Sequence, residues 1–182
     1  MVPEASLVQT EAGLVPEGSG WFVVNARDAR WVRREGRGDM VPLTGWSDEE
    51  AEANFREVGV NVFVLSPGEP MSMYHGESSQ EDFLMLAGDA VLIIEGEERP
   101  LGAWDFVHCP PWTEHVFVGA GDGPCLLLGV GARRKGRGIV YPANEVAQRH
   151  GAGVEVETGN PAEAYARFPE GKPIPCPEGF PP

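Results

Sequence analysis

The chain has 182 residues, a length that fits one domain with a single hydrophobic core. It contains 14 Lys+Arg and 28 Asp+Glu, and the net charge of -14 repels phosphate backbones and anionic lipids, so we expect neither nucleic acid nor membranes as partners. The three cysteines follow no paired spacing, which argues against a disulfide framework or zinc ribbon and favours a reducing, cytoplasmic location. No apolar stretch is long enough to span a membrane, and the first residues lack the pattern of an export signal.

The first part of the chain has only weak signals for regular structure. Residues 1–20 are rich in Gly, Pro and Glu without any period, which predicts a loose N-terminal arm. The apolar run at 21–24 and the pair Trp31 and Val32 predict extended segments that form an edge strand or cross to a partner subunit. Ser47 stands three residues before Glu50, the spacing of a capping box, and therefore predicts a short helix.

Between Val60 and Val130 the pattern changes to short runs of β-branched and aromatic residues separated by Gly, Pro, Asp and Glu. The runs are VNVFVL, FLML, AVLIIE, WDFVHC, HVFVG and CLLLGV. This regular spacing is typical of an all-β sandwich or barrel. We therefore divide the chain into the arm, a barrel at 21–140 and a C-terminal extension at 141–182.

The C-terminal extension is expected to add short elements around the barrel. A short helix is predicted around residues 144–150, followed by the segment AEAYARF. The closing KPIPCPEGFPP is rich in proline, which has no backbone N–H, and we expect it to lie extended on the surface without joining a strand ladder or a helix.

Four side chains in the barrel segment form a candidate metal site. His75 and Glu77 are two residues apart, so on a strand both point to the same face. Glu81 follows a small polar turn and can return to that face, while His115 begins a strand after the rigid Pro110 and Pro111 turn. Two imidazoles and two carboxylates inside an apolar barrel cost several kcal/mol each if they are charged and unpaired. A divalent metal would offset that cost.

Two segments resemble the paired motifs of the cupin family, at residues 67–88 (PGEPMSMYHGESSQEDFLMLAG) and 102–119 (GAWDFVHCPPWTEHVFVG). The first family motif has a glycine, an HxH pair, three or four residues, a glutamate, six residues and a glycine; the second has the form G, then PxGxxH. The spacing from Glu81 to Gly88 and from Pro110 to His115 follows these patterns. The resemblance implies a single double-stranded β-helix, or jelly-roll, barrel with short helices and extended termini.

The resemblance also implies a ligand set for one divalent metal ion per subunit, which could be Fe, Mn, Ni, Co or Zn. By position, His75 and Glu77 occupy the HxH pair, and Glu81 and His115 are the remaining ligands. Glu77 departs from the second histidine of the family motif, Trp112 replaces its glycine and Gly119 stands where an asparagine often occurs. An alternative register pairs Met73 with His75 and leaves Glu77 in the turn.

Several functions remain open at this point. The first is a metal-dependent enzyme, of oxygenase or isomerase type, that acts on a small polar molecule, with Glu77 as ligand or general base and His108 as a further acid or base. The others are a non-catalytic binding or sensor barrel and a metal-free isomerase in which His75 and His115 act as acid and base. We expect a homodimer. The basic patch GARRKGRG at 131–138 is a solvated loop, a subunit contact or a site for an anionic ligand.

Overall fold

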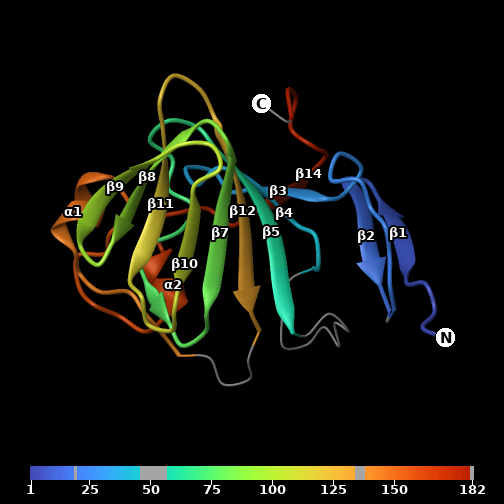
Figure 1. The fold of residues 1–182 in the computed structure, drawn as a ribbon, viewed down its shortest axis with the longest axis horizontal. Helices are drawn as coiled ribbons and strands as arrows, with labels where there is room; N and C mark the ends of the chain where they lie inside the picture. Colours follow the sequence, from blue (N-terminus) through green and yellow to red (C-terminus); the bar gives the residue numbers. More distant parts are fainter. Residues whose placement is uncertain (19, 46–56, 134–137, 181–182) are drawn as a thin grey trace.

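The computed structural model describes residues 1–18, 20–45, 57–133 and 138–180. The helix predicted from Ser47 lies outside these residues. The described chain is built almost entirely of antiparallel strands with two short helices, which confirms the predicted all-β barrel (Figure 1).

One seven-stranded sheet forms the larger wall of the barrel. Its strands are, in spatial order, β10 (Phe106–Cys109), β7 (Glu81–Ala87), β12 (Cys125–Ala132), β5 (Val58–Leu65), β4 (Asp39–Pro42), β3 (Trp31–Arg33) and β14 (Lys172–Ile174). A three-stranded sheet forms the opposite wall, in the order β11 (His115–Ala120), β8 (Asp89–Ile94) and β9 (Glu97–Leu101). A short pair, β13 (Ile139–Val140) and β6 (Gly76–Glu77), lies near the candidate site.

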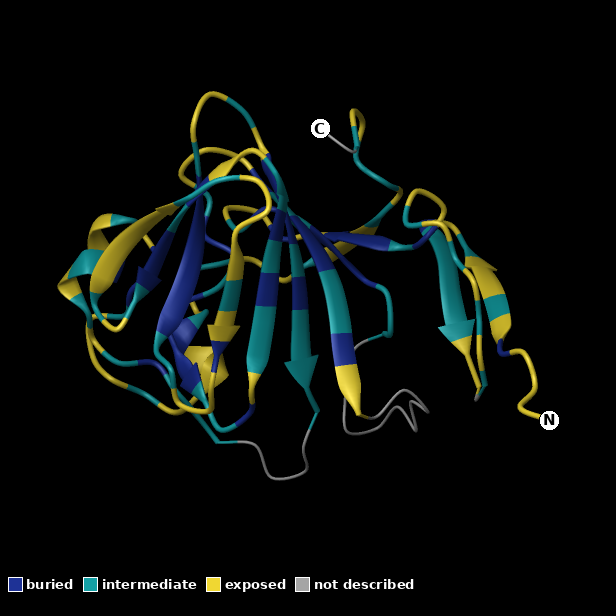
Figure 2. Ribbon diagram, viewed as in Figure 1, coloured by how far each residue is buried: buried dark blue, intermediate teal, exposed yellow. Residues whose placement is uncertain are grey.

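Successive side chains along each strand point alternately into the barrel interior and toward its outer face. On β12, Leu127 belongs to the main core cluster, whereas Leu126 packs in a separate outer cluster. The same alternation places Phe63 of β5 inside and Val62 outside. The interior residues of both sheets form one apolar core, whose members include Phe63, Phe83, Met85, Leu92, Phe117 and Leu127. Figure 2 shows that β11 is buried over nearly its whole length, whereas β9, at the edge of the smaller sheet, is mostly exposed.

Residues 145–152 of the C-terminal extension cover part of the outer face of the three-stranded sheet. Helix α1 (Glu145–Arg149) begins after Asn144, whose side chain accepts a hydrogen bond from Ala147 N at 3.0 Å, and this confirms the helix predicted around 144–150. Ala147 packs with Ile93 and Val116 in a second apolar cluster. Helix α2 (Pro161–Ala164) begins after Asn160 in the same way. None of the helices in the described ranges is long and apolar enough to cross a membrane.

The two ends of the chain are more ordered than their composition predicts. Residues expected to form a loose arm instead form a hairpin of β1 (Ser6–Thr10) and β2 (Gly13–Glu17), at the opposite end of the molecule from α1 (Figure 1). The Pro-rich terminus was predicted to stay outside any ladder, and this is wrong for β14, which pairs with β3. Pro173 is tolerated there because β14 is an edge strand and the missing N–H removes no bond to a further strand. Trp21 makes only an isolated bridge to Glu4.

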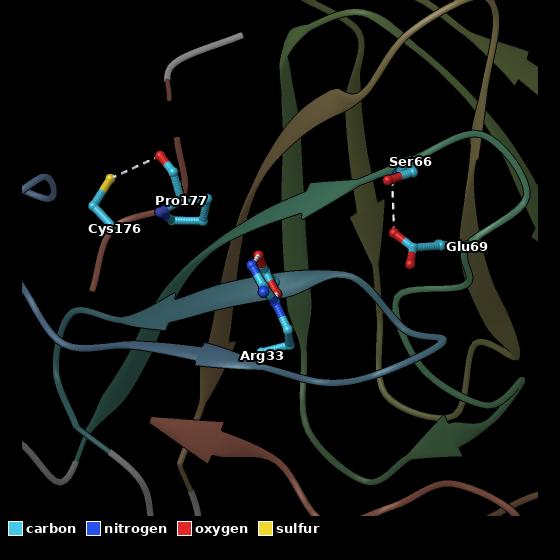
Figure 3. A network of polar contacts seen from close by, with 6 residues as sticks. Arg33, Ser66, Glu69, Cys176 and Pro177 are labelled. Atoms are coloured by element: carbon cyan, nitrogen blue, oxygen red, sulfur yellow. Dashed lines mark hydrogen bonds and ion pairs between the residues drawn. The ribbon is translucent and has the colours of Figure 1, made fainter. Parts of the chain in front are cut away.

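Figure 3 shows polar contacts away from the barrel interior, on strand β3, in the turn after β5 and in the C-terminal segment. Arg33 of β3 donates two hydrogen bonds to Asp39 of β4, at 3.1 and 3.0 Å. After β5, Ser66 N donates to Glu69 Oε2 at 2.9 Å and closes a turn. These contacts are exposed, so we expect each to contribute at most about 1 kcal/mol to stability.

Candidate metal centre

His75 and His115 lie directly opposite each other on neighbouring antiparallel segments. His115 N donates to His75 O at 2.9 Å, and His75 N donates to His115 O at 3.2 Å. Residues paired in this way present their side chains on the same face, and the two ring centroids are 5.0 Å apart. The backbone pairing therefore brings together two histidines that are forty residues apart in the sequence, at about the spacing expected for directly opposed side chains.

Hydrogen bonds to main-chain carbonyls orient both imidazole rings. His75 Nδ1 lies 2.7 Å from Met73 O, and His115 Nδ1 lies 3.0 Å from Thr113 O. A carbonyl oxygen can only accept, so in each ring Nδ1 carries the proton and Nε2 presents a lone pair. This is the arrangement by which proteins orient metal-binding histidines.

Glu81, the first residue of β7, places its carboxylate close to the Nε2 atoms of both histidines. Its Oε2 lies 3.4 Å from His115 Nε2 and 3.8 Å from His75 Nε2. The three side chains offer ligand atoms that all lie within 4.8 Å of one another. Two ligand bonds of about 2.0–2.2 Å to one divalent ion can join atoms up to about 4.4 Å apart. This range includes the distances of 3.4 and 3.8 Å from Glu81 Oε2 to the two Nε2 atoms.

The polar chemistry of this group fits a divalent cation. His115 Nε2 is buried and has no hydrogen-bond partner among the described residues. A buried acceptor without a partner is costly, and coordination to a metal would satisfy it. Two imidazole nitrogens and one carboxylate oxygen suit Fe, Mn, Co, Ni or Zn better than Mg or Ca.

Burial keeps both histidines in the form that binds metals. It lowers the pKa of His75 to about 3, with a smaller contribution from neighbouring His115, while the bond to Met73 O acts in the opposite direction. Burial likewise lowers the pKa of His115 below its usual value. Both rings are therefore neutral near pH 7, so metal binding needs no displacement of a proton from them.

A cavity of about 170 Å³ opens onto Glu81 between β5, β7 and β12. Its walls combine apolar side chains, such as Met71 and Phe83, with the polar groups of Asn61, Glu77 and Arg133. A small polar molecule that entered this cavity would meet a carboxylate that faces both imidazoles.

The structure brings together three of the four metal ligands predicted from the sequence, His75, Glu81 and His115. Glu77 lines the cavity but is not one of the three residues whose ligand atoms converge, so its role as ligand or base stays a prediction. In the alternative register, Met73 would replace Glu77, but the sulfur of Met73 lies 3.4 Å from Arg167 Nη2 and its carbonyl orients His75.

The side chain of His108 lies on the outer face of β10, away from the barrel interior. Strand β10 pairs Cys109 with Glu81 and His108 with Asp82, so Cys109 is buried inside while His108 points outward. His108 Nδ1 contacts Asp82 Oδ1 at 2.6 Å, and its side chain is 51% exposed. The proposed acid or base role of His108 stays a prediction that this position does not favour.

Two groups near the centre were not singled out from the sequence. Tyr141, at the end of the short β13 segment, places its ring 5.8 Å from that of His75, and its hydroxyl is hydrogen-bonded to Tyr165. Arg133 was noticed only as part of the basic patch at 131–138. The pattern that could have identified Arg133 is that Gly129, Gly131 and Arg133 occupy alternate positions. Alternate residues of an extended chain lie on the same face, so an arginine follows two positions that have no side chain.

The comparison with protein-family models agrees with the fold. A family model described as a cupin domain matches residues 61–131. No curated protein sequence matches the chain. Among solved structures, a sugar phosphate isomerase from a cupin superfamily of Silicibacter pomeroyi DSS-3 is 27% identical over 63% of this chain, with a TM-score of 0.47.

Two further solved structures are similar at lower identity. A candidate sugar phosphate isomerase of Acidithiobacillus ferrooxidans is 22% identical over 58% of this chain, with a TM-score of 0.49. A polyketide cyclase of Streptomyces resistomycificus is 19% identical over 54% of this chain, with a TM-score of 0.45. The matched region spans 66% of the length of each of these three proteins.

Proposed function

Because the chain belongs to the cupin superfamily through its domain at residues 61–131, we propose that it is a metal-dependent enzyme acting on a small polar molecule. The observation that supports this best is the convergence of His75, Glu81 and His115 beside a cavity. The proposed cofactor is one divalent ion per subunit, drawn from Fe, Mn, Ni, Co and Zn. An oxygenase or an isomerase is the proposed reaction type.

The three proposed ligands have distinct tasks. His75 and His115 would each bind through Nε2, with Nδ1 held by a main-chain carbonyl, and Glu81 would contribute negative charge. A bound ion would act as a Lewis acid on an oxygen of the substrate. Two histidines and one carboxylate leave open positions on such an ion. Glu77, in the cavity wall, is proposed either as a fourth ligand or as a base that accepts a proton from the substrate.

The cavity limits the size of the proposed substrate. At about 170 Å³ it is smaller than the roughly 300–1,000 Å³ of typical pockets for drug-sized ligands, which favours a small substrate. We propose a homodimer, since β10 is a sheet edge on which Phe106 is 64% exposed, and Trp104, just before it, is 74% exposed. The charge of -14 supports the proposal that the protein binds neither nucleic acid nor anionic membranes. Cys109, Cys125 and Cys176 are free thiols, which supports the proposed cytoplasmic location.

Water exchange at the metal distinguishes an enzyme from a binding protein. We expect the Mn²⁺-loaded protein to enhance the longitudinal relaxation of water protons more than free Mn²⁺ does, because a three-ligand centre retains exchangeable water. The measurement is water-proton relaxation during titration of the metal-free protein with Mn²⁺. A bound Mn²⁺ without exchangeable water would indicate a closed site and favour the binding or sensor alternative.

A further inference from the structure

Met73 and Tyr74, which lead into His75, depend on the C-terminal extension for main-chain contacts. Both residues lie outside the strands of the described chain, so their backbone N–H groups need partners other than a strand ladder. Met73 N donates to the hydroxyl oxygen of Tyr165 at 3.2 Å, and Tyr74 N donates to Ala152 O at 2.7 Å. Both acceptors belong to the extension, which lies beyond the part of the chain that matches the cupin domain.

Met73 also sets the orientation of the His75 ring. Its carbonyl oxygen lies 2.7 Å from His75 Nδ1, and this contact directs the lone pair of Nε2 toward the candidate metal centre. The main-chain N–H and C=O of one residue therefore link the Tyr165 hydroxyl to the imidazole. A shift of the Met73 backbone would move this carbonyl, and with it the orientation and the tautomer of the ring.

Neighbouring side chains hold both the ring and the hydroxyl of Tyr165. The hydroxyl is also hydrogen-bonded to that of Tyr141, whose ring lies 5.8 Å from the ring of His75. The Tyr165 ring packs edge-on against Tyr141, with 5.7 Å between the centroids. The guanidinium carbon of Arg37 lies 4.6 Å from the centroid of the Tyr165 ring. These contacts give Met73 N an acceptor at a defined place.

The side chain of Met73 contributes a second, less specific contact. It is 1% exposed and packs with Tyr141 and Ala164. Packing of a flexible thioether chain tolerates small shifts, whereas a hydrogen bond has a preferred direction and length. The bond from Met73 N to Tyr165 is therefore the contact best able to fix the Met73 backbone.

We propose that Tyr165 is a positioning residue for His75, which it holds in the metal-binding orientation through Met73. This inference rests on the proposed function and makes the C-terminal extension a support of the candidate metal centre. Groups that orient metal-binding histidines typically change metal affinity by about 10- to 100-fold. Tyr165 acts through one intervening residue, so we expect an effect near the lower end of this range.

Tyr165→Phe removes the hydroxyl and keeps the ring that packs against Arg37 and Tyr141. In the metal-free protein, long-range ¹H–¹⁵N NMR spectra report which imidazole nitrogen carries the proton, with the His75 signals assigned from the His75→Gln variant. We expect His75 of the parent to be protonated at Nδ1, and the variant to show a larger share of the Nε2–H tautomer. Titration with Co²⁺ is expected to give about tenfold weaker binding by the variant than by the parent.

Tyr74→Phe is the matched control for this experiment. The Tyr74 hydroxyl is also hydrogen-bonded, since it accepts from Gly96 N at 2.9 Å and donates to Glu114 Oε2 at 3.1 Å. Its ring, however, belongs to the second apolar cluster, with Ile93 and Val116. We expect this variant to keep the His75 tautomer and the Co²⁺ affinity of the parent, and urea unfolding of the three proteins compares their stability.

The two readouts separate the role of Tyr165 from the proposed function. An unchanged His75 tautomer or an unchanged Co²⁺ affinity in Tyr165→Phe, or equal changes in both variants, would overturn the role of Tyr165. Failure of the parent to bind Co²⁺ would instead contradict the proposed function, and the tautomer comparison in the metal-free protein would still decide whether Tyr165 positions His75.

Discussion

Replacing His115 with alanine is expected to lower the affinity for Co²⁺ or Zn²⁺ by at least about 100-fold. Loss of a group that only orients a ligand typically costs 10- to 100-fold in metal affinity, and His115 would be a direct ligand. The residue is 1% exposed and its Nε2 faces Glu81 at 3.4 Å. The measurement is titration of the chelator-treated protein with each metal, followed by elemental analysis after gel filtration.

His108→Ala is the matched control for this experiment. His108 is also a histidine in a barrel strand, but its side chain is half exposed and contacts Asp82 on the outer face. We expect this variant to bind about one metal ion per subunit with the affinity of the parent. Equal metal loss in both variants would indicate general destabilisation, and retention of metal by His115→Ala would remove His115 from the ligand set.

Acid should destabilise the metal-free protein as the pH falls below about 6.5. In the unfolded chain His75 has its usual pKa near 6.5, whereas in the folded protein burial lowers its pKa to about 3. Between these values the unfolded state binds a proton that the folded state does not. The free energy of unfolding therefore decreases as pH falls through this window, by up to about 1.4 kcal/mol per pH unit from His75, and His115 adds to the same trend.

His75→Gln isolates the contribution of one imidazole to this pH dependence. Glutamine does not titrate, so we expect the dependence of stability on pH between about 6 and 5 to be shallower by up to about 1.4 kcal/mol per pH unit. Urea unfolding of chelator-treated protein at several pH values gives this slope for parent and variant. Identical slopes in the two proteins would show that the burial of His75 does not shift its proton binding.

The core of the candidate site could be predicted because its residues sit in strongly patterned sequence. Glu81 has six residues between it and Gly88, the spacing of the first cupin motif, and His115 begins the run HVFV after two prolines. Their convergence with His75 follows from strand pairing. Glu77 could not be assigned in the same way, because β6 is only two residues long and its alternation cannot be read over a longer strand.

The parts of the fold that were not predicted from the sequence depend on contacts between segments that lie far apart along the chain. The hairpin of β1 and β2 lies in a Pro- and Gly-containing stretch. Strand β2 is also held by two further hydrogen bonds, in which Leu14 N donates to Asp28 O and Arg30 N donates to Leu14 O. Strand β14 contains Pro173, and only its position at the sheet edge makes pairing with β3 possible. The cavity was also missed, since a hollow made by glycines on two strands becomes visible only when their register is known.

Anomalous diffraction from crystals grown with Co²⁺ or Zn²⁺, measured on both sides of the metal's absorption edge, tests the central claim most directly. We predict one metal peak per subunit, about 2.0–2.2 Å from Nε2 of His75, Nε2 of His115 and a carboxylate oxygen of Glu81. The same map would show whether Glu77 completes the ligand set. A protein that binds none of the candidate metals at this point, or binds one away from His115, would contradict the account.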